Sequence, residues 1–515
     1  MPIFCLSLST LVTSRIEMLL LPLSSTRSLS CPISRCLQLY RTSSRIRDHR
    51  CSLSRTKGRQ SSSKIAFPNE TEVVFLSTVL PEPNSSAAGV RSEWLLRSIA
   101  SSPGIAKVHY IATTAAVTSP NQGNSPFQAR DETLASLTHD YGINFLQMLP
   151  NQAKETHEWI ATNLSGRQNV LVLFDRFYVE EMFSHYFHEA LPDESVLVLD
   201  MQDMHSLRSA RENAVPKQSD TLMPATSALP SLSDSHLLRE LSSIQRCDLT
   251  LVCSTVETHM LEHDFGIPPS KLCTSPMLFN PQDSIKRVCT NLQWQDRKDL
   301  CFIGNFLHKP NVDAVRQLQR LWPKLEKLLP ADTNIHIYGA YYDPSKHPVS
   351  RNKRFKIHGY CEDISAMMSA ARLMLAPLQF GAGLKGKIVE AWRYSLPVVT
   401  TSIGSEGLVS SQGHFPGKIA DTDEEFLQAV TKLYSSQSEW NACMYFAPSL
   451  LERLGARNTL ASLARVMESK TESRDRDIQR AILWQTSQQS SKYMSRWIEC
   501  KNKLATLSAR QDEDC

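Results

Sequence analysis

The stretch 375–406 reads LAPLQFGAGLKGKIVEAWRYSLPVVTTSIGSE and carries more structural information than any other part of the chain. An apolar run leads into a glycine-rich turn, an amphipathic segment begins at about Lys385, and a second apolar run follows at 397–401. Short apolar runs bounded by turn residues are typical of buried strands. The order strand, turn, helix, strand predicts a parallel sheet covered by helices.

The glycine-rich turn also suggests a binding site. Gly381 and Gly383 allow backbone angles and close approaches that a side chain would forbid. Free N–H groups and the helix dipole favour an anion at the helix start, where Lys385 and Lys387 add positive charge. Glu390, about one turn into the helix, suits a pair of neighbouring hydroxyl groups such as those of a ribose. The turn therefore predicts a diphosphate site, although such turns also occur for packing alone.

The same alternation of strand and helix extends through most of the chain, in two series. The expected strands of the first series are Glu72–Leu80, Lys107–Ala112, Ile143–Leu149, Asn169–Asp175, Ser195–Asp200 and Asp248–Ser254. Those of the second are Asp299–Gly304, Thr333–Tyr338, Phe355–Gly359, Arg372–Pro377 and Leu396–Thr401. The fold class is therefore α/β, with one Rossmann-like domain predicted at 67–285 and a second at 286–470.

Two segments depart from this rhythm. Residues 213–234, rich in Ser, Pro and Thr, predict a surface loop or insertion. The last 45 residues, 471–515, lack strand signals and predict a helical tail that docks an apolar face on the body. The residues of that face are Ile482, Trp484, Tyr493, Trp497 and Ile498.

The N-terminal segment 1–66 has the composition of a targeting leader. Its first 64 residues carry a formal charge of +9, which leaves −5 for the rest of a chain whose net charge is +4. A Ser- and Arg-rich, acid-poor segment is typical of an organellar transit peptide, for mitochondrion or plastid, although a plain extension or a misassigned start remains open. The apolar run Met18–Leu23 is too short to span a bilayer, so we expect no transmembrane segment.

The remaining composition narrows the class of protein. A mildly acidic body argues against nucleic acid as a partner. The thirteen cysteines form no CxxC pair, and no Cys/His cluster has zinc spacing. His259 and His263 are spaced for one helix face, but with no third ligand nearby a solvated face is the better interpretation. We expect no metal and no cofactor.

Residues 299–410 resemble the C-terminal domain of the GT-B glycosyltransferases, most closely family four, which includes sucrose synthase-like and phosphatidylinositol mannosyltransferase-like enzymes. The matching segments are CFIGNFLHKPNVDAV (301–315), IHIYG (335–339), FKIHGYCEDISAMMSAARLMLAPLQFGAGLKGKIVEAW (355–392) and LPVVTTSIGSEGL (396–408). A looser match in the first half includes LVLDMQDMHSLRSAR (197–211). The resemblance covers roughly residues 70–470 and implies two facing Rossmann-like domains.

The resemblance also implies roles for residues of the second domain. Glu390 matches the second Glu of the family's Glu-x(7)-Glu motif, which binds the donor ribose, whereas Ala382 stands where the first Glu normally contacts the donor sugar. Lys385 and Lys387 would hold the diphosphate, and Lys385 is a candidate catalytic residue. The further donor-binding candidates are Gly304 and Lys309 for phosphate, beside Asn305 where the family often has Arg, and Gly359 and Tyr360 for the base.

In the first domain the resemblance places Gly89, with Arg91 nearby, on a loop close to the donor phosphate. His205 is the candidate catalytic histidine that faces the donor sugar, although a packing cluster with Arg208 and Arg211 is an equal alternative. Asp175 and Arg176, at another strand end, are candidate acceptor contacts.

The predicted reaction is transfer of a sugar from a nucleoside diphosphate sugar to an unknown acceptor alcohol, with retention and without a metal. One alternative is a non-catalytic GT-B scaffold that binds a nucleotide sugar or a protein partner, which the missing first Glu favours. A nucleotide-sugar epimerase on the same plan is another.

Overall fold

The computed structural model describes residues 65–513 except 79, 84–85, 115–125, 217–219, 277–292, 456, 470–473 and 475–476. The predicted leader at 1–66 lies almost wholly outside these residues, as does the predicted domain boundary at 285/286. Residues 63–515 belong to one compact unit, and every contact below lies within it.

The first half of this unit is a seven-stranded parallel sheet in the order β3-β2-β1-β4-β5-β6-β7. Every residue of the three central strands β1, β4 and β5 is buried, as expected of a parallel sheet with helices on both faces. The strands are β1 (Thr71–Ser77), β2 (Ile105–Ala112), β3 (Asn144–Gln147), β4 (Val170–Asp175), β5 (Ser195–Asp200), β6 (Leu249–Val252) and β7 (Leu272–Thr274).

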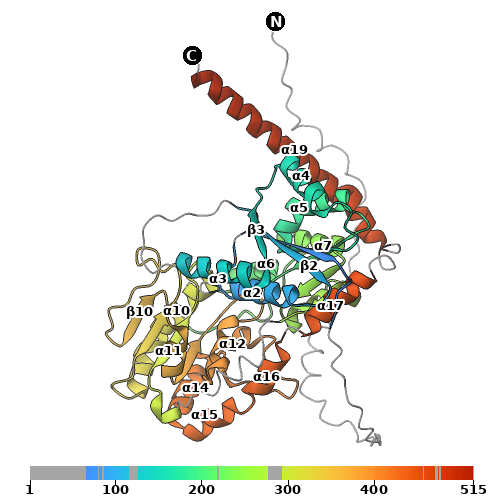
Figure 1. The fold of residues 1–515 in the computed structure, drawn as a ribbon. Helices are drawn as coiled ribbons and strands as arrows, with labels where there is room; N and C mark the ends of the chain where they lie inside the picture. Colours follow the sequence, from blue (N-terminus) through green and yellow to red (C-terminus); the bar gives the residue numbers. More distant parts are fainter. Residues whose placement is uncertain are drawn as a thin grey trace, which may run out of the picture. The chain divides into compact units, whose positions relative to one another are not determined.

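Helices follow the strands of this sheet in the alternating order seen in Figure 1. They are α2 (Ala87–Ala100), α3 (Pro126–Tyr141), α4 (Ala153–Leu164), α5 (Phe177–Ala190), α6 (His205–Ala214), α7 (Ser235–Arg246) and α8 (Thr255–His263). Two apolar clusters result, one that includes Val74 and Phe183 and one that includes Val73 and Leu95, because neighbouring residues of β1 point to opposite faces.

The second half is a six-stranded parallel sheet in the order β10-β9-β8-β11-β12-β13. Its strands are β8 (Leu300–Ile303), β9 (Ile335–Tyr338), β10 (Phe355–Gly359), β11 (Leu373–Ala376), β12 (Val398–Thr400) and β13 (Gly417–Ile419). Its helices are α10 (Lys309–Leu328), α11 (Ile364–Ala370), α12 (Gly386–Arg393), α13 (Ser402–Ser405), α14 (Asp423–Ser435), α15 (Gln437–Met444) and α16 (Ala447–Arg453). Every predicted strand is present; β7 and β13, three residues each, were missed.

The segment after α6 differs from the predicted surface loop. Leu222 is buried in the apolar cluster of the second sheet, and its N–H donates to Asp423 Oδ1 at 3.0 Å. Gln379 accepts from the N–H groups of Met223 and Ala225 at 2.9 and 2.8 Å. The segment is a loop, as predicted, and Met223 is exposed, but the surface prediction is wrong for Leu222. The polar sequence around Leu222 gives no sign that its side chain packs against residues far along the chain.

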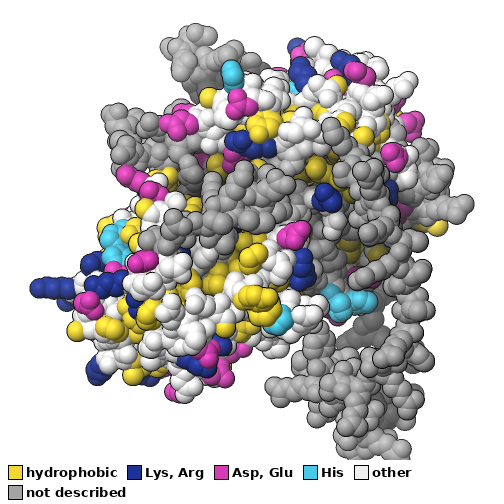
Figure 2. All heavy atoms as spheres, turned by 60° about the horizontal axis from the view of Figure 1, so that its bottom comes forward, with side chains coloured by type: hydrophobic (Ala, Val, Ile, Leu, Met, Phe, Trp, Pro, Cys, Tyr) yellow, Lys and Arg dark blue, Asp and Glu magenta, His cyan; other side chains and the backbone are white. Residues whose placement is uncertain are grey.

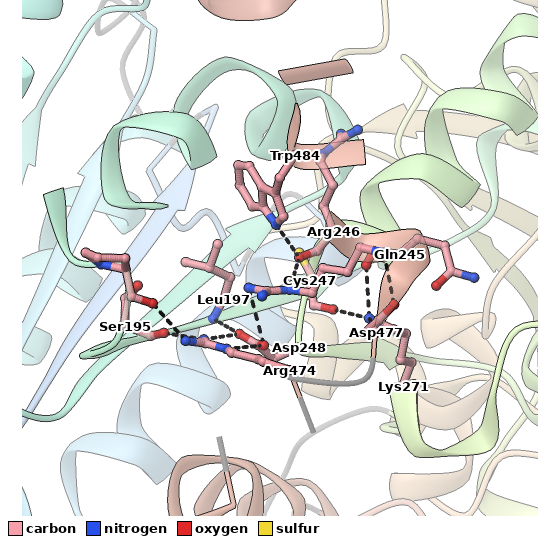
Figure 3. Close-up of polar contacts among 12 residues, drawn as sticks. Ser195, Leu197, Gln245, Arg246, Cys247, Asp248, Lys271, Arg474, Asp477 and Trp484 are labelled. Atoms are coloured by element: carbon pink, nitrogen blue, oxygen red, sulfur yellow. Dashed lines mark hydrogen bonds and ion pairs between the residues drawn. The ribbon is translucent and has the colours of Figure 1, made fainter. Parts of the chain in front are cut away.

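After the second sheet the chain returns to the first. Leu463 and Met467 of α17 (Arg457–Glu468) are buried in the cluster that contains Val73. Arg474 then reaches into the end of the sheet, where its Nε and Nη2 donate to Asp248 at 2.8 and 2.6 Å (Figure 3). Asp248 in turn accepts from the N–H of Leu197 at 2.9 Å. The segment around Arg474 is therefore held to β5 through Asp248.

The last helix, α19 (Ile478–Glu513), lies beside α5 and α7 (Figure 1). Trp484 is buried and donates from Nε1 to Arg246 O at 3.3 Å. The predicted docking face is correct for Trp484 but wrong for Ile482, Tyr493 and Trp497, which are exposed. The helix is rotated so that small and polar residues such as Gln488 and Ser495 face the body.

Two surface properties bear on partners. On the face drawn in Figure 2, Lys and Arg side chains are interspersed with Asp and Glu. In the described part of the chain, no helix combines the length and apolar character that crossing a bilayer would need.

Candidate functional site

The glycine-rich turn between β11 and α12 meets the carboxyl end of β5. Gly381 and Gly383 have φ angles of 144° and 66°, which favour glycine. A Cβ on Gly383 would lie 2.9 Å from Asp203 Cβ and 3.3 Å from Gln202 O. Glycine is therefore required both for the conformation of the turn and for its close approach to the loop between β5 and α6.

Arg211 of α6 links this loop to the turn. Its Nη1 donates to Gly381 O at 2.8 Å and to Glu406 Oε2 at 2.7 Å, and its Nη2 donates to Glu406 Oε1 at 2.6 Å. The side chain of Arg211 is 2% exposed. A buried bidentate pair of this kind fixes both distance and orientation, so it sets how the two sheets' edges meet.

Glu257 of α8 makes a second contact between the first sheet and the glycine-rich turn. Its Oε1 accepts from Gly383 N–H at 2.7 Å and from Met204 N–H at 3.4 Å, while the buried Oε2 has no hydrogen-bond partner. Burial, and then the nearby Asp203 carboxylate, raise the pKa of Glu257 to about 7. The Gly383 amide, predicted to be free for an anion, is thus occupied by a carboxylate of the chain itself.

Lys385 and Lys387 lie together beside the turn. Lys385 is buried, and its Nζ donates to Gly383 O at 2.6 Å and to Ala382 O at 3.3 Å. Lys387 Nζ contacts Asn311 Oδ1 and lies 4.4 Å from the ring centre of Phe302. Within the described part of the chain, neither ammonium group is ion-paired with a carboxylate.

The pKa values of both lysines reflect this arrangement. Burial lowers the pKa of Lys385, with Glu406 opposing the shift. Burial, and then the positive charge of Lys385, lower the pKa of Lys387 to about 7. Two neighbouring ammonium groups that form no ion pair at contact distance within the described residues are unfavourable, and an anion between them would relieve that cost. Phosphate groups are among the anions that lysine side chains bind.

His205 lies at the N-terminus of α6, on the first sheet's side of the same edge. Its Nε2 is 3.6 Å from Asp203 Oδ1, and its ring packs edge-on against Phe177 at 5.5 Å between centroids. Burial lowers the pKa of His205 to about 4 although Asp203 opposes the shift. The imidazole is therefore neutral near pH 7 and offers a hydrogen bond rather than a charge.

Further cations surround this edge. Arg208 Nη1 donates to Asp203 Oδ2 at 2.5 Å. The pKa of His308, which precedes α10, is lowered by burial and then by Arg208, with smaller effects from Arg176 and Lys387. These charges influence one another because α6, the N-terminus of α10 and the glycine turn converge on one region.

Of Glu390 and the remaining donor-site candidates of the second domain, only Gly304 is linked by a described contact to the lysine pair, through Asn311. Glu390, partly exposed on α12, accepts from Arg393 Nη1 at 2.6 Å. Lys309 begins α10, is 75% exposed and pairs with Glu212 at 2.6 Å. Gly359 has a φ of 80° and precedes the half-buried Tyr360. A Cβ on Gly304 would lie 2.6 Å from the Asn311 side chain that contacts Lys387.

The candidates of the first domain have structural partners. Gly89 lies in the first turn of α2 rather than on a loop. A Cβ there would lie 2.3 Å from Glu82 O, so the close packing of this turn requires glycine. Arg91 is fully buried against Asp200. Asp175 accepts from Ser77 Oγ at 2.6 Å, Gln202 Nε2 at 3.1 Å and Arg176 Nη1 at 3.1 Å.

Sequence reasoning missed Glu257, Glu406 and the bridging role of Arg211. Arg211 stands in the segment 197–211 and Glu406 closes the stretch quoted first, but neither residue type predicts a partner almost two hundred positions away. Among the described residues, no three His, Cys, Asp or Glu side chains converge as metal ligands. The ring centroids of His259 and His263 lie 4.2 Å apart, and the two rings are tilted by 44° to each other.

Comparison with known proteins gives this geometry a context. Residues 297–436 match the family model described as glycosyl transferases group 1, so this part of the chain is a glycosyl transferases group 1 domain. The predicted enzyme class, a glycosyltransferase, is confirmed. A search of curated proteins found no match.

Three solved structures illustrate the similarity of the fold. The pneumococcal O-GlcNAc transferase GtfA, in complex with UDP and GlcNAc, has a TM-score of 0.54 at 12% identity over 78% of this chain and 99% of its own. HepE from Anabaena, in complex with UDP and glucose, has a TM-score of 0.51 at 12% identity over 78% and 99%. Sucrose-phosphate synthase from Thermosynechococcus elongatus has 0.51 at 12% over 78% and 100%. At these identities the likeness establishes the fold, and the predicted two-sheet GT-B architecture is confirmed.

Proposed function

We propose that this chain, with its glycosyl transferases group 1 domain at 297–436, transfers a glycosyl group from a nucleoside diphosphate sugar to an acceptor hydroxyl. The observation that carries the proposal is the pair of Lys385, which is buried, and Lys387, which is half-buried, at the glycine turn. Their ammonium groups donate to carbonyl and amide oxygens, and neither forms an ion pair within the described part of the chain. A diphosphate supplies the two negative charges that this pair lacks. Because HepE and GtfA were solved with UDP, uridine is the first base to test.

In the proposed reaction the bond between the anomeric carbon and the phosphate oxygen breaks, and its electron pair leaves with the diphosphate. The acceptor oxygen bonds to the anomeric carbon and passes its proton to the phosphate oxygen that the broken bond releases. Negative charge therefore grows on the diphosphate, where Lys385 and Lys387 would stabilise it without a metal. Positive charge develops on the sugar ring as the bond breaks. The neutral imidazole of His205 would offer the sugar a hydrogen bond at that stage.

Before the donor binds, Glu257 would have to release the Gly383 amide. Its carboxylate holds the Gly383 N–H at 2.7 Å, where a donor phosphate would compete for the same amide. Protonation of Glu257, whose pKa lies near 7, weakens this internal contact.

Retention of anomeric configuration is proposed on the resemblance alone. Ala382, where the family has Glu, leaves the non-catalytic scaffold as the rival.

The decisive experiment measures donor turnover by the full chain. The protein is incubated with uridine, guanosine and adenosine diphosphate sugars, and the released nucleoside diphosphate is quantified with and without simple alcohol acceptors. We expect one donor to be consumed, and Lys385→Ala to abolish its consumption while the folded fraction is unchanged. Thermal unfolding with the same ligands reports binding separately, because a ligand specific to the folded state raises Tm. Binding without turnover of any donor would support the non-catalytic scaffold. The absence of both binding and turnover would refute the donor site.

A further inference from the structure

The apolar residues of α19 that the body leaves uncovered form one stripe. Ile482, Tyr493, Trp497 and Leu504 are 55%, 62%, 59% and 65% exposed. Successive members are eleven, four and seven positions apart, close to whole helical turns, so the four side chains project in nearly the same direction. Exposed apolar groups that gather on one line mark a binding surface more often than scattered ones do.

The stripe cannot turn toward the body, because the opposite side of α19 is fixed. Gln488 Nε2 donates to Ser184 Oγ at 2.6 Å, and Trp484 Nε1 donates to Arg246 O at 3.3 Å. Arg480 Nε donates to the same carbonyl at 3.0 Å. Just before the helix, Lys271 pairs with Asp477 at 2.7 Å (Figure 3). These contacts fix the rotation of α19 about its own axis, so the stripe faces away from the body.

Positive charge flanks the stripe. Between residues 491 and 505 the helix carries Lys492, Arg496, Lys501 and Lys503 against a single acid, Glu499. Lys492 and Lys503 pair with Glu189 and Glu499 at 2.5 and 2.7 Å. Lys501 Nζ lies 5.4 Å from the ring centre of Trp497, and Arg496 is exposed. The excess charge on this face is therefore positive.

We propose that α19 docks on the surface of an anionic membrane through Tyr493, Trp497 and Leu504, with Arg496 and Lys501 contacting lipid phosphates. Trp and Tyr suit the boundary between head groups and acyl chains, and neighbouring Lys and Arg supply attraction to anionic lipid. The helix lies on the bilayer and does not span it. Pairing with a second copy is disfavoured because two stripes brought together would carry like charges into contact. The inference does not depend on the proposed reaction.

Vesicle co-sedimentation of the full chain tests this proposal. Phosphatidylcholine vesicles are compared with vesicles that also contain phosphatidylglycerol, at low and high salt. We expect binding to the anionic vesicles that weakens with salt. Trp497→Ser should reduce the partition coefficient about tenfold. The double variant Arg496→Glu with Lys501→Glu should reduce it by roughly fivefold for each basic residue replaced.

The matched control is Tyr445→Ser, since Tyr445 is 79% exposed and lies outside α19. All variants share the basic segment 1–64, so any attraction of that segment to lipid cancels in the comparison. Unchanged thermal unfolding shows that each variant is folded. Equal vesicle binding by Trp497→Ser and the unmodified chain overturns the proposal. A dimer in sedimentation velocity that Trp497→Ser converts to monomer, without vesicle binding, also overturns it and assigns the stripe to self-association.

Discussion

The carboxyl ends of the two sheets both collect charged residues, but they satisfy them differently. At the first sheet Arg91 and Asp200, 1% and 0% exposed, form a bidentate pair whose remaining donors reach Ser275 O and Pro276 O at 2.6 and 2.7 Å. At the second sheet Lys385 and Lys387 reach only carbonyl and amide oxygens. A charge cluster that is complete within the protein serves stability, whereas one that lacks its counter-ion is prepared for a ligand.

The largest expected effect is on the completed cluster. Asp200→Asn leaves the Arg91 guanidinium buried without its counter-charge, so we expect the free energy of unfolding to fall by about 3 kcal/mol or more. Urea denaturation measures this. Asp193→Asn, at an exposed position in the turn between α5 and β5, serves as control. A loss below about 1 kcal/mol, as for a surface pair, would mean that the contrast between the two sheets is false.

The lysine pair should behave in the opposite way. Lys387→Met removes a cation from the proposed diphosphate site, so nucleotide affinity should weaken by about 2 kcal/mol, which is roughly thirtyfold. Stability should be unchanged or higher, because no ion pair is broken. Isothermal titration and urea denaturation measure the two quantities. Lys353→Met, at an exposed position in the turn before β10, should change neither. Lost stability with unchanged affinity would assign Lys387 to the fold.

The pH dependence sharpens the same contrast. The pKa of Lys387 is lowered from 10.5 to about 7 in the folded protein, so between these values the unfolded chain binds the extra proton. Stability therefore rises as pH increases from about 7 toward 10.5, and this contribution is constant below 7. Nucleotide affinity should fall over the same range, by up to about tenfold per pH unit, because the anion must recruit a proton to Lys387.

Two variants separate the groups that titrate in this range. Lys387→Met should flatten the affinity profile measured by titration calorimetry from about pH 7 to about pH 9. Glu257, whose pKa is raised to about 7, becomes negative over the beginning of this range and would also oppose an anion, so Glu257→Gln reports its share. A slope that survives in both variants would place the titrating group elsewhere.

The smallest expected effect concerns Glu390. It is partly exposed and paired with Arg393, so its proposed bond to a ribose is worth about 1 kcal/mol, or roughly fivefold in affinity. Glu390→Gln should reduce the preference for a ribonucleoside diphosphate over its 2′-deoxy analogue, measured by competition. Glu424→Gln, at an exposed position of α14, should leave the preference intact. An unchanged preference in Glu390→Gln would remove the ribose contact.

Much of the fold followed from the sequence because its signals are local. Apolar runs between turn residues predicted eleven strands in two series, and all are present. The two missed strands, β7 and β13, are three residues long, too short to show a pattern. Gly381, Gly383, Lys385 and Lys387 were found together because one turn holds them all.

The tertiary structure alone decided the contacts between distant segments. Nothing in the sequence pairs Arg211 with Glu406 or Glu257 with Gly383, because the residues of each pair lie far apart in the chain and neither side chain has a local pattern. The burial of Leu222 and the exposure of Trp497 are of the same kind. A hydrophobic pattern shows that a side chain is apolar, but what covers it depends on which surface the completed fold brings against it.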